Sequence, residues 1–298
     1  MMKNTAKKHH QIIIMVLILI ISSCASFKPG WKNTDISMKS GDAKLLLEKA
    51  LELENKASTG EQVLELIKAF KLVVDADPEN YEALWRIGNY NILMGAAYCE
   101  KRKDKKFHYK EAIQYCEKAM YLNPSFKQQV ENDVNVWDAV NQLDKNYIDA
   151  MGYWYTARFY YFKECLGKFG RLFNTKMVIK NNLVIARIDS LNPDWAGGGN
   201  YFSRAIYFIA VPEKFGGSKT KAAEEFEKAI KAGPAFLVNR WGRAKYINSL
   251  IGNKKGYVDD LNWVLVQNPH NSGNTYPWNV YFQNQAKLML SEVDKVFK

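Results

Sequence analysis

The stretch from Leu191 to Pro234 constrains the fold most, because it specifies two amphipathic helices separated by chain breakers. In its first half, apolar side chains recur at the spacing of one helix face, at Phe202, Ala205, Ile206, Ile209 and Ala210. Its second half repeats this spacing at Ala222, Ala223, Phe226, Ala229 and Ile230. Pro212 and the pair Gly216–Gly217 interrupt the two runs, and Gly233 ends the second. The stretch therefore predicts a helix hairpin with small residues on its inner face.

A repeated helix-pair pattern extends this prediction to the rest of the chain. The order Ala222, Phe226, Ala229 and Pro234 matches the second helix of a tetratricopeptide repeat. A second match joins Leu84, Ile87 and Gly88 in a first helix to Ala112, Cys116, Ala119 and Pro124 in its partner. Small side chains at Gly88 and Ala112 indicate that these helices touch closely. We therefore predict an all-α fold of irregular tetratricopeptide-like hairpins that form a compact α-solenoid.

Other segments show helical periodicity without this repeat spacing. The pattern predicts paired helices over 42–56 and 61–75, and one amphipathic helix through Val130, Val134, Trp137 and Val140. An aromatic-rich helix is expected over 148–169, and a final helix over 278–297 that caps the stack.

The first residues indicate export. Lys3, Lys7 and Lys8 precede the apolar run 12–21, which is too short to span a bilayer, and then Ile21-Ser22-Ser23-Cys24. This site resembles a bacterial lipobox, which implies cleavage before Cys24 and lipidation of its side chain. Ala25 follows the cysteine, where lipoproteins retained in the inner membrane often carry Asp, so we expect an outer-membrane anchor facing the periplasm. The predicted division is a signal peptide (1–23), a lipidated tether (24–40) and a helical domain (41–298).

Charge and cysteine content restrict the function classes. The formal net charge of +11 becomes 39 − 31 = +8 once the three lysines of the signal are removed. Such an excess suits nucleic acid, anionic lipid or an acidic partner, and the exported address argues against nucleic acid. Three cysteines remain after Cys24, which leaves a Cys99–Cys116 bridge open but excludes a complete disulfide framework.

The sequence offers little for catalysis, so no enzyme activity, metal or cofactor is expected. The part of the chain after residue 23 has only His108 and His270, and no CxxC pair. Gly217-Ser218-Lys219-Thr220 lacks the glycine before lysine that a P-loop requires, and it is better explained as a turn in which Ser218 or Thr220 caps a helix.

The aromatic segment supplies a candidate binding face. Trp154, Arg158 and Tyr161 lie at i, i+4 and i+7, which places them on one side of the expected helix. A buried guanidinium needs a partner, so Arg158 would meet either an acid of this protein or an anionic ligand. Both interpretations stay open from the sequence alone.

Two glycine clusters complete the candidate site. Gly197-Gly198-Gly199 lies beside Trp195 and Tyr201, where it would either allow close approach of a ligand or chain, or form a sharp bend. Gly216 and Gly217 form the break inside the hairpin. A basic insertion, 101–106, is expected to be a solvated loop or helix extension, or else a contact with anionic lipid or an acidic partner.

These features occur in an order that resembles a known family. The lipobox, GYWYTARFYYFKECLGKF, LNPDWAGGGNYFSRAI, the break at Pro212, Phe215-Gly216-Gly217 and AAEEFEKAIKAGP together look like the TatT family, the T component associated with tripartite ATP-independent periplasmic (TRAP) transporters. The resemblance implies a periplasm-facing lipoprotein of helical repeats that self-associates and meets the periplasmic substrate-binding subunit of the transporter.

Two function hypotheses follow. In the first, the chain is a non-enzymatic scaffold that binds this subunit and a small organic-acid or hydrophobic ligand. In the second, it is a tetratricopeptide-like lipoprotein that acts in the assembly of outer-membrane complexes. The sequence does not identify the ligand or the number of subunits in an oligomer.

Overall fold

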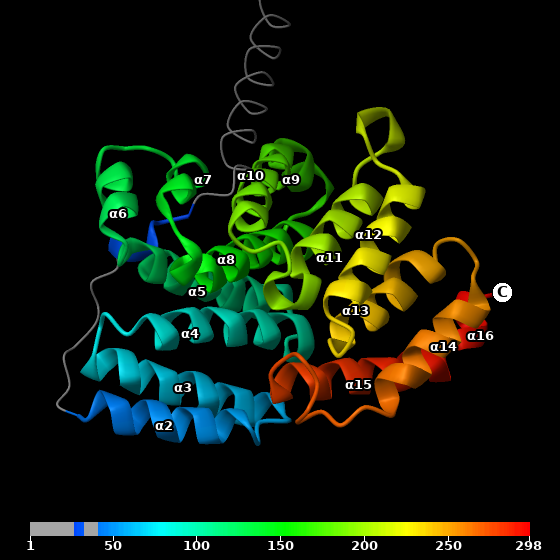
Figure 1. The fold of residues 1–298 in the computed structure, drawn as a ribbon, viewed down its shortest axis with the longest axis horizontal. Helices are drawn as coiled ribbons and strands as arrows, with labels where there is room; N and C mark the ends of the chain where they lie inside the picture. Colours follow the sequence, from blue (N-terminus) through cyan, green and yellow to red (C-terminus); the bar gives the residue numbers. More distant parts are fainter. Residues whose placement is uncertain (1–26, 33–40) are drawn as a thin grey trace, which may run out of the picture.

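The computed structural model describes residues 27–32 and 41–298, so the predicted signal segment and Cys24 lie outside the described residues. All regular structure in these residues is helical, which confirms the predicted all-α class. The N-terminal part contains η1 (Gly30–Lys32), α2 (Ala43–Glu54), α3 (Gly60–Ala76), α4 (Tyr81–Leu93), η2 (Met94–Tyr98) and α5 (Arg102–Tyr121). Figure 1 shows α2, α3, α4 and α5 stacked in chain order. The basic insertion forms the start of α5, so it is a helix extension rather than a loop.

The middle part first packs against this stack and then continues into helices that lie outside it. It contains α6 (Pro124–Glu131), α7 (Val136–Ala139), η3 (Val140–Gln142), η4 (Lys145–Tyr147), α8 (Ile148–Tyr160), η5 (Tyr161–Cys165), α9 (Lys168–Phe173) and α10 (Thr175–Leu191). Helix α8 packs against α4 and α5, and α10 packs against α8. Helix α8 therefore joins the stack to the rest of the molecule.

The C-terminal part begins with the hairpin predicted from 191–234. It contains α11 (Trp195–Ala210), η6 (Glu213–Phe215), α12 (Lys219–Ala232), α13 (Leu237–Gly242), η7 (Arg243–Asn248), α14 (Lys254–Leu265), α15 (Tyr276–Ser291) and α16 (Val293–Val296). In Figure 1 these helices form a second group beside the α2–α8 stack. The helices differ in length and are interrupted by short turns, in keeping with the predicted irregular hairpins, while the solenoid itself stays a prediction.

Local chemistry explains where the predicted helices begin. Asp42, Thr59, Asn80 and Ser218 each accept a hydrogen bond from a backbone N–H in the first turn of the helix that follows. Such caps satisfy donors that have no partner inside the helix. The sequence interpretation of Ser218 as a helix cap, rather than part of a phosphate loop, is therefore confirmed.

Close packing of α4 on α5 also follows the prediction. A Cβ added to Gly88 would lie 2.4 Å from Cys116 Sγ, and Ala112 is fully buried. The helices can approach this closely only because both positions lack a larger side chain. Cys99, Cys116 and Cys165 are all free thiols, so Cys99 and Cys116 are not bridged in this structure.

Two predicted helices are shorter than their periodicity suggests. The helix expected through Val130 to Val140 is broken after Glu131, where Asp133 has a left-handed backbone (φ 61°). The helix expected over 148–169 ends at Cys165, and Leu166 is extended before α9 begins. At the first break, apolar side chains turn inward from two separate short helices, α6 and α7, which periodicity alone cannot distinguish from one long helix. At the second break, α9 buries none of its residues.

The segment 27–32 packs against the helical body. The backbone N–H of Gly30 donates to Glu117 Oε2 at 2.7 Å, and the Trp31 ring stacks on Tyr121 with centroids 5.5 Å apart. A Cβ on Gly30 would lie 2.1 Å from the carbonyl oxygen of Gln114 in α5, so only glycine fits there. This part of the expected tether is therefore held in place. Within the described ranges, 27–32 and 41–298, no helix is both long and apolar enough to cross a bilayer.

A hydrogen bond joins α15, near the C-terminus, to the N-terminal stack of helices. Trp278 Nε1 in α15 donates to Asn89 Oδ1 in α4 at 2.8 Å. Trp278 also packs face to face on Phe282, with centroids 5.6 Å apart. Helix α15 thus returns to the N-terminal stack and does more than cap the end of a row.

Candidate functional site

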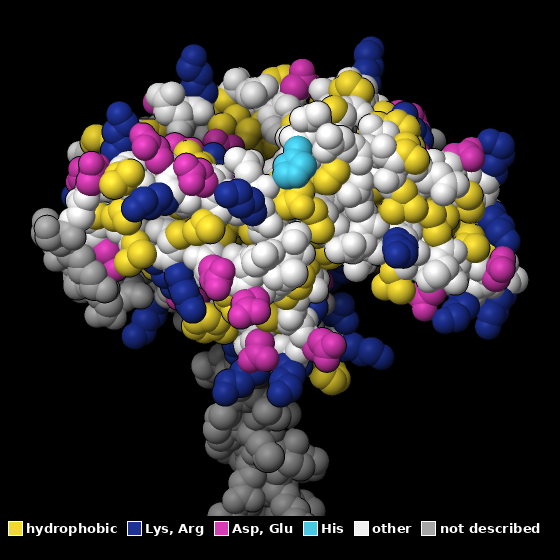
Figure 2. Space-filling view, turned by 90° about the horizontal axis from the view of Figure 1, so that it is seen from below, with side chains coloured by type: hydrophobic (Ala, Val, Ile, Leu, Met, Phe, Trp, Pro, Cys, Tyr) yellow, Lys and Arg dark blue, Asp and Glu magenta, His cyan; other side chains and the backbone are white. Residues whose placement is uncertain are grey.

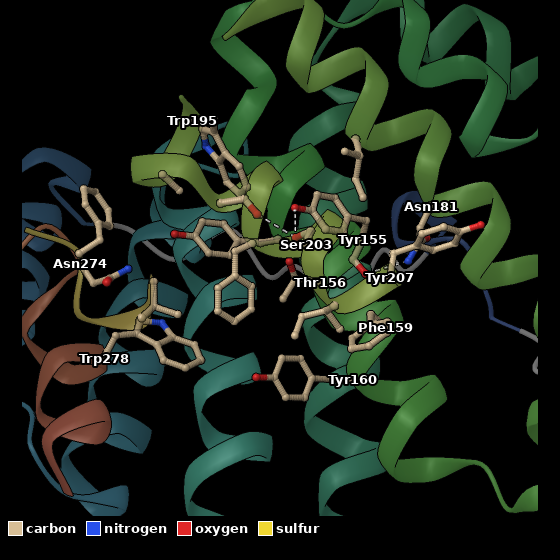
Figure 3. Close-up of a pocket in the computed structure, with 18 of the residues that line it drawn as sticks. Tyr155, Thr156, Phe159, Tyr160, Asn181, Trp195, Ser203, Tyr207, Asn274 and Trp278 are labelled. Atoms are coloured by element: carbon tan, nitrogen blue, oxygen red, sulfur yellow. Dashed lines mark hydrogen bonds between the residues drawn. The ribbon is translucent and has the colours of Figure 1, made fainter. Parts of the chain in front are cut away.

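A cavity of about 360 Å³ lies among α8, α10, α11, α13 and α15 (Figure 3). This volume is in the range of small-molecule sites. Twelve of the 27 lining residues are aromatic, namely Tyr153, Tyr155, Phe159, Tyr160, Trp195, Phe202, Tyr207, Phe236, Trp241, Tyr246, Trp278 and Phe282. A surface of this kind favours apolar carbon and offers a few polar groups at fixed places.

A hydroxyl pair lies on the α8–α11 side of the cavity. Tyr155 Oη and Ser203 Oγ are 2.8 Å apart (Figure 3). Tyr155 Oη also donates to Asn200 Oδ1 at 3.4 Å. Burial raises the pKa of Tyr155 to about 12. The phenol therefore stays neutral at physiological pH and can hydrogen-bond without bringing charge into the site.

Three other lining residues carry buried polar side-chain atoms without a hydrogen-bond partner among the described residues. They are the donor Nε1 of Trp241, the acceptor Oδ1 of Asn274 and the hydroxyl Oγ1 of Thr275. A buried donor or acceptor that has no partner costs about 1–3 kcal/mol. A molecule in the cavity with both an acceptor and a donor would recover part of this cost.

Positive charge gathers at one end of the cavity. Lys163 Nζ lies 3.4 Å from Tyr246 Oη and 5.2 Å from the centroid of the Tyr246 ring. Desolvation lowers the pKa of Lys163, and it lowers the pKa of Lys245 to about 8, with the charge of Lys163 adding to the second effect. Lys105 and Glu164 are ion-paired nearby at 2.7 Å. The end of the cavity thus has an excess of cations over acids.

Trp195 forms part of the wall because α8 carries a glycine beneath it. A Cβ on Gly152 would lie 1.9 Å from Cη2 of the indole, and Trp195 Nε1 donates to Asp149 Oδ1 at 2.8 Å. The ring is therefore fixed both by packing and by a hydrogen bond. Of the residues proposed as binding residues from the sequence, Trp195 lines the cavity.

The glycine bend supports this wall from behind. Ala196, Gly197 and Gly198 have left-handed backbones with φ of 50°, 60° and 87°. A Cβ on Gly198 would lie 2.8 Å from Cα of Ala229, and Asn239 Nδ2 donates to the carbonyl oxygen of Gly197 at 2.8 Å. Gly197 and Gly198 therefore make a sharp bend that another part of the same chain approaches closely, and the adjacent Ala196 and Gly199 line the cavity.

Trp154, Arg158 and Tyr161 share one face, as predicted, but this face points away from the cavity. The cavity is lined by Thr156, Phe159 and Tyr160. A turn of 100° per residue places these on the opposite side of the helix from the predicted trio. The structure therefore does not bring the trio together with Trp195.

The guanidinium of Arg158 contacts one acid and three aromatic rings of this protein. Its Nη1 lies 4.0 Å from Glu117 Oε1, and its guanidinium lies over the rings of Phe27, Trp137 and Trp154 at 4.5, 4.3 and 4.8 Å. Burial lowers the pKa of Arg158 to about 10, and the charge of Glu117 opposes this shift. These contacts are the ones expected if the partner of Arg158 is an acid of this protein rather than an anionic ligand.

The remaining candidates also lie outside the cavity lining. Tyr201 stacks under the guanidinium of Arg204, 4.8 Å from its ring centroid. Gly216 and Gly217 form the turn before α12, where a Cβ on Gly217 would lie 1.7 Å from the carbonyl oxygen of Val211. Their place in the fold is explained by chain geometry.

Sequence reasoning missed Lys163, Trp241, Asn274 and Trp278. For Lys163 the sequence does contain an indication, because it follows the cavity-lining Tyr160 by three residues and so lies on the same helix face. The other three come from α13, the loop before α15 and α15 itself. Nothing in the sequence indicates that these segments meet α8.

The residues that could hold a metal are few. No group of three or more His, Cys, Asp and Glu side chains is arranged as a metal site in the described part of the chain.

Comparison with known proteins identifies the family of the chain. No curated protein matches the chain. The model of a family described as the TRAP transporter T-component matches residues 91–297, which is more than two thirds of the chain and includes every lining residue of the cavity. The chain therefore belongs to the TRAP transporter T-component family.

Proposed function

We propose that this chain is a non-enzymatic scaffold, anchored to the outer membrane through a lipidated Cys24 and facing the periplasm. It self-associates, binds the periplasmic substrate-binding subunit of a TRAP transporter, and holds a small organic acid with an apolar body in its cavity. Membership of the T-component family supports the transport role. The observation that carries the ligand is the aromatic cavity with a cationic end at Lys163.

The chemistry of the wall favours an amphipathic anion. The rings exclude water from an apolar chain, and burial of each CH₂ group contributes about 0.8 kcal/mol. A carboxylate next to the ammonium of Lys163 would form a charge-assisted hydrogen bond, which is stronger than a neutral one. The Tyr155–Ser203 hydroxyl pair could meet a polar group along the chain.

A matched pair of probes tests the ligand. Decanoate and decanol have the same chain length and differ in charge, and their binding can be measured by calorimetry on residues 25–298, which include every described residue. Lys163→Gln should lower the affinity for decanoate by about tenfold or more and leave the affinity for decanol nearly unchanged. Lys255→Gln, on the exposed surface of α14, serves as the control. If Lys163→Gln lowers the affinity for both probes equally, or for neither, the assignment of the cationic end would be contradicted.

A separate experiment tests the cavity itself. Ser203→Phe places a ring in the wall opposite Tyr155 and should block both probes while the helical content is unchanged. Retained binding of both would show that they bind elsewhere.

Partner capture tests the scaffold role. The full chain, purified from membranes with its associated proteins, should retain the periplasmic substrate-binding subunit when analysed by mass spectrometry. Recovery of outer-membrane assembly proteins in its place would favour the assembly hypothesis and contradict the transport role.

Fractionation of cells tests the anchor. Cys24→Ala should move the folded protein from the membrane fraction to the soluble fraction, because alanine has no thiol to which lipid can be attached. Unchanged sedimentation with membranes would contradict lipidation as the anchor.

A further inference from the structure

The segment from Cys165 to Ile188 differs from the rest of the surface. It contains five basic residues and no acid, and it includes α9 and most of α10. By contrast, Figure 2 shows acidic and basic side chains interspersed on the face that contains α2, α3 and α15. An acid-free stretch of this length makes a local positive field that suits an anionic surface.

Large apolar side chains are exposed in the same segment. Phe169 is 77% exposed and Leu172 is 67% exposed, and together with Phe173 they occupy positions i, i+3 and i+4 of α9. On α10, Ile179 and Leu183 are also exposed and lie one turn apart. Exposed apolar side chains that gather on one face indicate a contact with another surface.

The basic side chains lie between these apolar ones and carry unopposed charge. Lys168, Arg171 and Lys176 are exposed, and no ion pair is formed by them among the described residues. Basic residues that alternate with Phe and Leu are typical of segments that lie in the headgroup region of a bilayer.

The place of this segment in the fold favours a membrane over a protein partner. The ring of Phe27 packs on Tyr161, with centroids 4.9 Å apart, and Tyr161 begins the turn that leads into α9. Phe27 follows Cys24 by three residues, a reach of about 11 Å at most. An anchor at Cys24 would therefore hold this side of the body at the lipid surface.

The start of α5 adds charge on the same side. Arg102 Nε donates to the carbonyl oxygen of Cys165 at 2.7 Å, so the basic insertion packs against the turn before α9. Lys103, Lys106 and Phe107 remain exposed there. Two basic and apolar segments thus lie together close to the residues that follow the anchor.

We propose that α9, with the exposed side of α10, is a second membrane contact that inserts Phe169 and Leu172 between anionic phospholipid headgroups. Only its orientation rests on the proposed lipid anchor, since the charge and exposed apolar surface belong to the folded body. The contact fixes the body against the bilayer, where a single anchor would leave it free to rotate.

Vesicle binding tests this contact without the anchor. Residues 25–298 should co-sediment with vesicles of phosphatidylcholine and phosphatidylglycerol in a 70:30 ratio, and much less with phosphatidylcholine alone or in 0.5 M salt. Arg171→Glu with Leu172→Ser should weaken binding at least about tenfold. Lys287→Glu with Leu288→Ser is the matched control, because it makes the same charge change in a basic–leucine pair that is also exposed, on α15.

The outcomes separate this contact from its alternatives. Equal binding by both double variants, or no binding of the unmodified body to anionic vesicles, would overturn the proposal. A change in self-association without a change in vesicle binding would assign the segment to an interface between copies, and would also overturn it. Loss of the anchor in Cys24→Ala has no influence on this assay, so the two proposals can fail independently.

Discussion

Arg158 and Glu117 form a buried pair in which each charge is disfavoured by its surroundings. Burial raises the pKa of Glu117 and lowers the pKa of Arg158. The carboxylate is held by Trp154 Nε1 at 2.9 Å and by the backbone N–H of Gly30, so it connects α5, α8 and the segment 27–32. The pair is therefore a structural connection between three parts of the molecule.

Removal of one partner should be costly. Arg158→Met leaves the Glu117 carboxyl without its cation, and we expect the free energy of unfolding to fall by about 3–5 kcal/mol. Urea denaturation measures this loss. The same substitution in a Glu117→Gln background should cost clearly less, because no buried acid is then stranded. Identical losses in the two backgrounds would show that the charges are not coupled.

Lys245 predicts a dependence of stability on pH. Its pKa is lowered from 10.5 to about 8 by burial, with Lys163 adding to the effect and Glu164 opposing it. Between pH 8 and 10.5 the unfolded chain binds more protons at Lys245 than the folded chain does. The free energy of unfolding should therefore rise as pH increases from 8 to 9.5. Lys245→Met should flatten this rise in urea titrations. A rise of equal slope in the variant would assign it to other groups.

At the scale of helices, the α4–α5 contact is the sharpest test of packing. Gly88→Leu forces the side chain into Cys116, so the unfolding free energy should decrease by about 1–3 kcal/mol. Gly167→Leu is the control, because an added Cβ there meets nothing within 4 Å. Equal melting temperatures for the Gly88 variant and the unmodified protein would argue against this interface.

Helix pairs were predictable from sequence where caps and apolar faces agree. The spacing of Phe202, Ala205 and Ile206 and the cap at Ser218 predict the α11–α12 hairpin, and the structure confirms it. The breaks at Asp133 and after Cys165 were not predictable, because a left-handed residue and a π-helical turn leave no periodic signal. Helix breaks of this kind are decided by packing against other elements.

At the scale of the molecule, the Trp278–Asn89 hydrogen bond should stabilise the docking of α15. Trp278→Leu leaves Asn89 Oδ1 buried without a partner, at a cost of about 1–3 kcal/mol. Hydrogen–deuterium exchange over Tyr276–Ser291 should then become faster. Leu288→Ser, on the exposed side of the same helix, should have little effect, and unchanged exchange in the Trp278 variant would contradict the role of this bond.

The cavity could be predicted from sequence only in part. Trp195 and the aromatic content of α8 indicate a binding surface, yet helical phase could not tell which side of α8 faces the cavity, since rings occur on both sides. Trp154 and Arg158 pack inward on α5, while Thr156 and Phe159 face the cavity. Asn274 and Trp278 reach the site only because α15 returns to α4, which is a property of the whole chain.

The return of α15 to α4 determines when the site comes into existence. Synthesis delivers Tyr155 long before Trp278, so the α2–α8 stack can fold while one wall of the cavity is still missing. A chain that ends before α15 would lack this wall and would leave the aromatic surface open to water. The cavity can thus be closed only in molecules whose synthesis has passed α15, so its formation depends on a segment more than 100 residues after Tyr155.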